Sequence, residues 1–288
     1  MSKQSTQSTY TGRGHIETRS WQAGGTSMRE AMVMRASGDE RRERILHEVM
    51  AHGKATVTGL SELLGVTTET IRKDLMTLGE RNVISKRHGF VTLATPMPEH
   101  DSEQGESLHL AEKTAIAERA ARLAPQDAAV FLDTSTTVLC LASLLALRSD
   151  LTVITNSIDV CHALARSGSK ILVTGGLYRT KSNSCVGSWA LRSMESVNVD
   201  VAFLGCDGFS PEGPTIRSYQ EVEFKRMVTR RAKRTVLLAD TSKLGNTGLY
   251  TFANYADFSL MIFERELNVG ERKVLPKNVA LIDVVPPS

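Results

Sequence analysis

Apolar residues between positions 38 and 94 recur at the spacing of amphipathic helices. The pattern predicts three short helices, which are followed by two extended runs around a polar turn. The predicted helices are 41–52, 59–64 and 68–79, with a short extended piece at 55–57 and a β-hairpin formed by 83–84 and 90–93 around 86–89. Three helices followed by a hairpin is the element order of a winged helix-turn-helix domain.

The third predicted helix combines an apolar inner face with a polar outer face. Thr67 stands at its N-cap position, as Asp39 does for the first helix. Ile71, Leu75 and Leu78 form the apolar stripe that would pack on the other helices. A helix held in this way can enter the major groove of DNA with its polar face. The candidate DNA-contacting residues are Thr67, Thr68, Glu69, Thr70, Arg72 and Lys73 of this helix, with Lys86, Arg87 and His88 of the hairpin.

Beyond position 110, continuous apolar runs alternate with amphipathic stretches. Such runs, separated by helices, predict a largely parallel sheet that is covered on both faces. The predicted strands are 129–132, 151–154, 170–173, 200–204, 235–239 and 258–262, with an edge strand over 279–285, and the predicted helices include 112–123, 138–147, 157–166 and 219–232. The expected fold class is α/β, with an N-terminal winged helix-turn-helix domain ahead of a C-terminal α/β domain.

Composition places the boundaries between these parts. Residues 1–37 are rich in Ser, Thr, Gly and Gln without periodicity, which predicts a disordered tail. Residues 95–110 contain two prolines and few apolar groups, which is typical of a linker. The expected division is therefore a tail over 1–37, a winged helix-turn-helix domain over 38–94, a linker over 95–110 and a second domain over 111–288.

The overall charge limits the kinds of partner. The 288 residues are 41% hydrophobic and 23% charged, with a formal net charge of +3. This small excess excludes a protein that coats nucleic acid through a broadly basic surface, but it permits one small DNA-binding module.

The sequence has no long apolar run and no apolar signal-peptide core near its start, so we expect a cytoplasmic protein without a membrane partner. The four cysteines are spaced about twenty residues apart, which favours reduced thiols over a metal site, and no cofactor is expected.

Small polar residues follow five of the predicted strands. The carboxyl ends of parallel strands lie along one edge of a sheet, where ligands bind. Hydroxyls, backbone N–H groups and helix N-termini gathered there suit a phosphate or a polyol. Ordinary turn chemistry explains any single loop better than a ligand does, but five such loops together favour a shared site. The i, i+4 spacing of Glu221 and Lys225 alone is usual for a surface ion pair. The five segments are 133–137, 155–157, 174–176, 205–208 and 240–243.

Residues 41–93 resemble the N-terminal domain of the DeoR family of bacterial transcriptional regulators. The segment that carries the resemblance is Val-Thr-Thr-Glu-Thr-Ile-Arg-Lys-Asp-Leu over 66–75, followed by Lys-Arg-His-Gly. The family typically has Val-Ser-x-x-Thr-Ile-Arg-Arg-Asp-Leu and then Arg-x-His-Gly-Gly. Thr67 replaces the serine and still suits a cap, Lys73 replaces an arginine, and Phe90 replaces the second glycine, so the turn of the wing is expected to differ.

The second domain resembles the sensor domain of the same family. This resemblance implies a fold shared with ribose-5-phosphate isomerase and coenzyme A transferases, and a phosphorylated sugar or related effector. Ser135 stands where the family usually has glycine, and Gln220 where an acidic residue is common, so either residue could alter which ligand fits or abolish binding. With the strand ends, the effector-site candidates are Asp133, Thr134, Ser135, Thr136, Thr137, Thr155, Asn156, Gly175, Gly176, Asp207, Glu221, Lys225, Asp240 and Lys243.

The expected function is sequence-specific regulation of transcription, with repression of a carbohydrate operon as the default. The expected partners are a double-stranded DNA operator, a phosphorylated effector and further copies of the chain in a dimer or tetramer, with residues 111–288 binding the effector and forming the oligomer. One alternative is a sugar-phosphate isomerase on the same fold, but a helix-turn-helix has no use there and no clear acid–base pair is evident. Another is a repressor whose second domain only forms oligomers. The chain also lacks the P-loop and H-E-x-x-H motifs, so we do not expect an enzyme.

Overall fold

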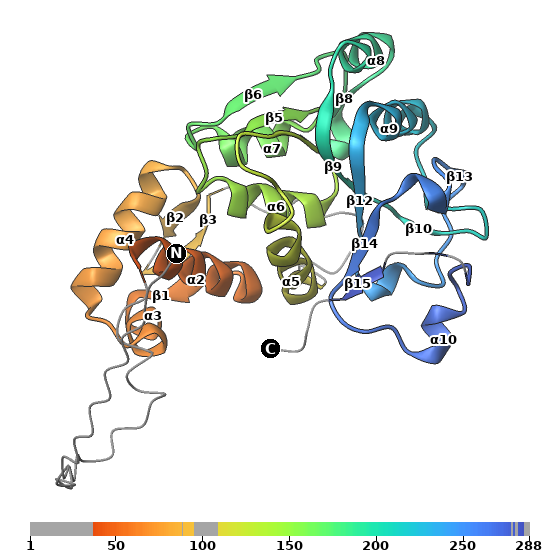
Figure 1. Ribbon diagram of the computed structural model, residues 1–288. Coiled ribbons are helices and arrows are strands. Elements are labelled where there is room, and N and C mark those ends of the chain that lie inside the picture. The colour runs from red at the N-terminus through yellow and green to blue at the C-terminus, as the bar shows by residue number, and fades with distance from the viewer. Residues whose placement is uncertain (1–36, 88, 95–108, 278, 280–281, 285–288) are drawn as a thin grey trace, which may run out of the picture. The chain divides into compact units, whose positions relative to one another are not determined.

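Two groups of elements follow one another along the chain in the computed structural model (Figure 1). The structure describes residues 37–87, 89–94, 109–277, 279 and 282–284, so nearly all of the predicted tail and linker lie outside the described residues. The first group consists of α2 (Gly38–His52), β1 (Ala55–Thr56), α3 (Val57–Leu64), α4 (Thr68–Glu80), β2 (Ile84–Arg87) and β3 (Phe90–Leu93). This is the predicted order of three helices and a hairpin, and we call it the head.

Side-chain caps set the starts of the helices in the head. The hydroxyl of Ser37 accepts the backbone N–H of Glu40, whose carboxylate accepts the N–H of Ser37 in return. The prediction that Asp39 caps this helix is therefore wrong, because α2 begins at Gly38 and Asp39 lies in its first turn. Thr67 does cap α4, as predicted, through the N–H of Thr70 at 3.2 Å.

The wing of the head is a three-stranded antiparallel sheet in the order β1-β3-β2. β2 and β3 pair from Ile84 opposite Leu93 to Arg87 opposite Phe90. Lys86 and Arg87, which were predicted to lie in the turn, therefore belong to β2. The inner stripe of α4 is buried as predicted, with Ile71, Leu75 and Leu78 at most 1% exposed.

The second group is built on a parallel sheet of seven strands in the order β15-β14-β12-β9-β4-β5-β6. Every neighbouring pair is parallel, as the apolar runs predicted, and β15 is the expected edge strand. The strands are β4 (Ala129–Leu132), β5 (Thr152–Thr155), β6 (Lys170–Val173), β9 (Val199–Gly205), β12 (Ala232–Leu238), β14 (Leu260–Phe263) and β15 (Ile282–Val284). The ends of these strands place the polar loops along one edge of the sheet.

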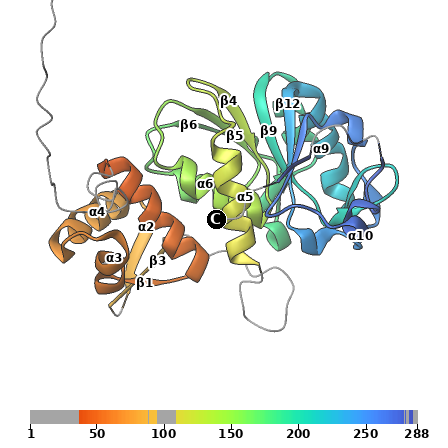
Figure 2. The same ribbon diagram turned by 60° about the horizontal axis from the view of Figure 1, so that its bottom comes forward.

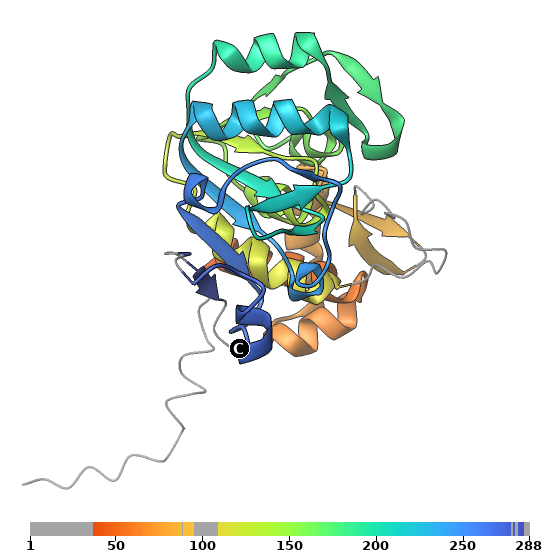
Figure 3. The same ribbon diagram turned by 90° about the vertical axis from the view of Figure 1, so that its right-hand side faces the viewer.

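Helices cover both faces of this sheet. α5 (Leu110–Ala121) and α6 (Thr136–Leu145) lie side by side on one face (Figures 1 and 2), near α7 (Ile158–Leu164). α8 (Ser188–Glu195) and α9 (Tyr219–Arg231) cover the other face (Figure 3). Side chains alternate between the two faces: Leu132 belongs to the core under α5 and α6, whereas Phe131 meets Phe224 of α9 at 5.9 Å between ring centroids.

Several short elements were not predicted from the sequence. They are too short to show a period, and their bounds depend on contacts with distant segments. They are α8 itself, β7 (Leu177–Arg179), β8 (Ser184–Val186), β10 (Gly208–Phe209), β11 (Pro214–Ile216), β13 (Tyr250–Thr251), α10 (Val269–Arg272) and the 3-10 turns η1 (Thr180–Ser182), η2 (Thr241–Lys243) and η3 (Tyr255–Asp257).

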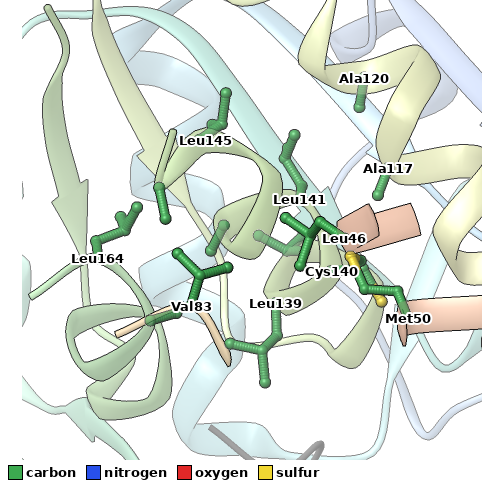
Figure 4. Packing of buried hydrophobic residues seen from close by; sticks show 14 of the residues in the cluster. Leu46, Met50, Val83, Ala117, Ala120, Leu139, Cys140, Leu141, Leu145 and Leu164 are labelled. Atoms are coloured by element: carbon green, nitrogen blue, oxygen red, sulfur yellow. The ribbon is translucent and has the colours of Figure 1, made fainter. Parts of the chain in front are cut away.

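One hydrophobic core joins the head to the helices of the sheet domain. Leu46 and Met50 of α2 belong to the same buried cluster as Ala117 of α5 and Leu141 of α6 (Figure 4). The guanidinium of Arg81, just after α4, also donates a hydrogen bond of 2.7 Å to the carbonyl oxygen of Leu147. Head and sheet domain therefore share buried apolar surface.

A histidine contact between α2 and α5 makes the stability of this region depend on pH. The imidazole of His47 pairs with the carboxylate of Glu118 on α5. That hydrogen bond raises the pKa of His47, although burial and Arg44 oppose it. A pKa raised above the unfolded value stabilises the fold at low pH, and this contribution disappears as the pH rises through the folded pKa.

We therefore expect His47→Gln to lower the free energy of unfolding more at about pH 5.5 than at about pH 8.5. Chemical denaturation of both proteins across that range measures the difference. The unfolding free energies of the two proteins should converge as the pH rises, and a constant gap would contradict the assignment.

Candidate DNA interface and ligand site

The outer face of α4 presents polar side chains to solvent. Arg72, Lys73 and Met76 are exposed, and a guanidinium nitrogen of Arg72 lies 3.6 Å from the carboxylate of Glu69. Among the other DNA-contact candidates, Thr67 and Lys86 are exposed and Thr68 and Thr70 are partly buried, while the side chain of Arg87 and all of His88 lie outside the described residues. A polar outer face on a helix whose inner face is fixed has the form that enters a major groove.

A buried ion cluster that was not predicted from the sequence fixes α4 against α2. The carboxylate of Asp74 is 4% exposed and accepts hydrogen bonds from Arg41 at 2.5 and 3.1 Å and from Arg42 at 3.3 Å. The hydrogen bond with Asp74 in turn raises the pKa of Arg41. An acidic residue next to Leu75 on the apolar side of a helix was the available signal, since such a charge requires a partner.

The end of β4 carries a second buried ion pair. Asp133 pairs with Lys225, which comes from α9, and the two side chains are 2% and 4% exposed. The Lys225 ammonium also donates to the carbonyl oxygen of Gly205 at 3.1 Å, and the N–H of Gly205 donates to Asp133 at 2.9 Å. Of the two alternatives for Glu221 and Lys225, the surface ion pair is wrong, because Lys225 points into the sheet edge. Their role in an effector site stays a prediction.

Three carboxylates surround this lysine. Burial lowers the pKa of Lys225, but Asp133 and Glu221 raise it more, so the ammonium stays protonated. Burial raises the pKa of Glu221, whose carboxylate lies 3.0 Å from a guanidinium nitrogen of Arg179. Asp207 is a further neighbour of both groups. We call Asp133, Asp207 and Glu221 the acidic cluster; its oxygens are suited to accept hydroxyl hydrogens.

The loop after β4 leads from the acidic cluster to the start of α6. The hydroxyl of Ser135 caps this helix by accepting the N–H of Val138 at 3.2 Å. A Cβ on Gly205 would lie 2.3 Å from the Cβ of Ser135, so only glycine fits at this point of β9. Thr134 and Thr136 are partly buried and Thr137 is buried. Because β4 ends at Leu132, residues 133–137 lie at the carboxyl end of this strand.

Residues at the ends of β5 and β6 have mostly structural partners. The Thr155 hydroxyl donates to the carbonyl oxygen of Leu132 at 2.7 Å. The amide nitrogen of Asn156 donates to the Cys185 carbonyl at 3.1 Å. A Cβ on Gly176 would lie 2.6 Å from the Val186 carbonyl oxygen, so packing of β8 explains this glycine. Gly175, the other predicted glycine, also follows β6, at the edge of the sheet.

Two buried oxygens on the carboxyl edge have no hydrogen-bond partner within the described structure. They are Oδ1 of Asn156 and Oδ2 of Asp240, which follow β5 and β12. The other oxygen of Asp240 accepts the N–H and hydroxyl of Ser242. A buried acceptor without a donor costs about 1–3 kcal/mol, so a ligand that donates hydroxyl hydrogens would be stabilised at this edge.

Two further findings concern the described residues as a whole. They contain no group of three or more His, Cys, Asp or Glu side chains arranged to hold a metal ion. Within the same part of the chain, every helix is too short or too polar to cross a membrane.

A head of this form, joined to a sheet domain with a polar carboxyl edge, defines a DNA-binding regulator with a sensor domain. Residues 41–96 match the model of the DeoR-like helix-turn-helix domain, and residues 108–265 match that of the DeoR C terminal sensor domain. The chain belongs to the DeoR family of transcriptional regulators.

Relatives in several organisms are similar over most of their length. An uncharacterized HTH-type regulator, YulB of Bacillus subtilis, is 34% identical over 86% of this chain and 96% of its own. The repressor GlcR of the same species is 34% identical over 83% and 93% of the two chains, and the regulator GlpR of Haloferax volcanii is 31% identical over 85% and 98%. These names place the chain among transcriptional regulators rather than enzymes.

Solved structures with a similar arrangement are distant. A ribose-5-phosphate isomerase in complex with phospho-erythronic acid is 17% identical, with 46% of this chain and 52% of that chain covered and a TM-score of 0.35. The eIF2B delta subunit of Chaetomium thermophilum is 12% identical, with 83% and 96% covered and a TM-score of 0.39.

Proposed function

We propose that this protein represses a carbohydrate operon and that a phosphorylated sugar or related metabolite, bound at the carboxyl edge of the sheet, changes its affinity for DNA. One observation carries the ligand half of the proposal: buried oxygens of Asn156 and Asp240 lack partners where five strand ends meet. A polyhydroxylated ligand supplies the missing donors. The relative GlcR is named a repressor, which supports repression rather than activation of transcription.

On the DNA side, α4 would lie in the major groove. Arg72 is exposed and long enough to contact a guanine edge, and Lys73 beside it suits a phosphate. Lys86 on the wing adds a positive charge for the backbone. The proposed DNA-binding residues remain Thr67, Thr68, Glu69, Thr70, Arg72, Lys73, Lys86, Arg87 and His88.

On the ligand side, the acidic cluster would accept sugar hydroxyls. The first turn of α6 offers backbone N–H groups and the positive end of the helix dipole to an anion. Ser135 caps α6 and contacts Gly205, so it narrows this loop and favours a small ligand. The proposed effector-site residues are Asp133, Thr134, Ser135, Thr136, Thr137, Thr155, Asn156, Gly175, Gly176, Asp207, Glu221, Lys225, Asp240 and Lys243.

Tight selection of an operator requires more than one head. A single module buries too little surface for high specificity, and paired modules read half-sites at a fixed spacing. We therefore propose that the protein acts as a homo-oligomer, a dimer or a tetramer. Sedimentation of the full-length chain, alone and with operator DNA, tests this part.

The central experiment is footprinting of the protein on its own upstream DNA, with and without a panel of phosphorylated and unphosphorylated sugars. The proposal requires a protected region that a phosphorylated compound weakens or rearranges. Protection that no compound changes would indicate a repressor whose second domain only forms oligomers. No protection at low salt would end the proposal.

Arg72→Ala is expected to weaken operator binding by about 1–3 kcal/mol, because it removes a contact to a base edge. Gel-shift titration against operator and unrelated duplexes measures the loss. Arg230→Ala is the matched control, since Arg230 is an exposed arginine on α9. Operator affinity that is equal in both variants would remove Arg72 from the interface.

A further inference from the structure

An exposed aromatic ring lies on the outer face of the wing. Phe90, the first residue of β3, is 40% exposed, whereas Val91 beside it is 1% exposed. Successive residues of a strand point to opposite faces of a sheet, so Val91 packs into the core and Phe90 faces solvent. The family typically has glycine at this position, so neither core packing nor the shared fold accounts for the ring.

A lysine that the proposed DNA interface does not include lies over this ring. The Nζ atom of Lys54 is 4.9 Å from the centroid of the Phe90 ring, which is within the range of a cation–π contact. Lys54 immediately precedes β1, in which Thr56 pairs with Phe90. Because Lys54 is two residues from Thr56, it lies on the same face of the wing as a diagonal neighbour of Phe90. The ring therefore holds the ammonium group of Lys54 close to the turn between β2 and β3.

Lys54 adds a positive charge to a part of the wing that already carries one. Lys86 of β2 is exposed and pairs with Val91, so Lys86 and Lys54 come from the two strands that flank β3. None of the salt bridges found within the described part of the head involves either lysine. Two exposed ammonium groups without a carboxylate partner there form a surface that is suited to DNA phosphates.

We propose that Lys54 is a further contact of the wing with the DNA backbone and that Phe90 is the residue that positions it. This inference rests on the proposed function and adds two residues to its DNA side. A phosphate binds a cation whatever the neighbouring bases are, so Lys54 strengthens binding without selecting a sequence. The ring restricts the flexible lysine side chain before DNA binds, which reduces the conformational entropy that is lost in the complex.

The test is gel-shift titration of the full-length protein with a duplex of its own upstream region and with an unrelated duplex, at several salt concentrations. Lys54→Met should reduce the slope of log affinity against log salt concentration by about 0.9, the value for one lost phosphate contact. At about 0.1 M salt this slope corresponds to an affinity loss of about eightfold. Both duplexes should be affected alike, because the contact is to the backbone.

Variants of Phe90 test its positioning role. Phe90→Leu keeps an apolar side chain but removes the ring, and should weaken binding about two- to fivefold. Phe90→Tyr keeps the ring and should bind DNA as the wild type does. In a protein that already carries Lys54→Met, Phe90→Leu should have no further effect, because the ring acts only through the lysine. A merely structural role of Phe90 would give the same loss with or without Lys54.

Lys170→Met is the matched control, because Lys170 is an exposed lysine of β6 in the sheet domain. Thermal unfolding of each variant shows whether it is folded. An unchanged salt slope in Lys54→Met would overturn the inference and leave the proposed function intact. An effect of Phe90→Leu that persists without Lys54 would overturn the role of the ring. A wild-type protein that binds neither duplex at low salt would end the proposed function together with this inference.

Discussion

Replacing Lys225 by methionine is expected to lower the free energy of unfolding by about 3–5 kcal/mol, because it leaves the Asp133 carboxylate buried without its cation. The side chains are 4% and 2% exposed, so water cannot replace the lost ammonium without rearrangement of the sheet edge. The Gly205 carbonyl would lose a hydrogen bond of 3.1 Å as well. Denaturation in urea, followed by circular dichroism, measures the change.

The matched control is Lys233→Met, which removes a lysine from a surface pair with Asp200. Lys233 is 74% exposed, and such pairs contribute about 0–1 kcal/mol. The double variant Asp133→Asn/Lys225→Met should recover part of the loss, since no buried charge remains. If Lys225→Met lowered the free energy of unfolding no more than Lys233→Met does, the buried ion pair would not be what stabilises this edge of the sheet.

Asp74→Ala is expected to destabilise the protein by about 1.5–3 kcal/mol, because it removes the charge-assisted hydrogen bonds that join α2 to α4. Arg41 and Arg42 are partly exposed, so solvent can hydrate them after the change and the cost stays below that of Lys225→Met. Operator affinity should fall as well, since α4 would lose its fixed orientation on the head.

Asp39→Ala is the control for this variant. Asp39 also pairs with Arg42, but its side chain is 85% exposed, so little change in stability is expected. Urea denaturation and gel-shift titration of both variants separate a structural effect of Asp74 from a general effect of charge. Unchanged stability in Asp74→Ala would mean that the apolar stripe alone holds α4 in place.

The larger part of the fold could be predicted because burial repeats at the period of each element. Ile71, Leu75 and Leu78 lie on one side of a helix whatever surrounds them, and continuous apolar runs indicated a sheet covered on both faces. The positions of the polar loops at one edge followed from parallel strand order alone. Thr67 was recognised because an N-cap depends only on residues within one turn.

The parts that escaped prediction depend on residues far apart in the sequence. Lys225 is four residues from Glu221 on α9, yet its ion-pair partner is Asp133, which follows β4, so local spacing alone suggested a different pair. The burial of Asp74 is explained by its ion pair with Arg41, which is far from it in the sequence. Asp39 and Ser37 are both acceptable caps, and the choice between them rested on where the chain enters α2.

The core that joins the head to the sheet domain affects how this protein can be dissected. A head cut off within 95–108 would leave Leu46 and Met50 facing water instead of α5 and α6. Such a fragment would tend to aggregate, and its DNA affinity would be a poor guide to that of the whole chain. Replacing the head by that of a relative would therefore require more than an exchange of α4. The buried residues that α2 packs against α5 and α6 would also have to match on both sides of this contact.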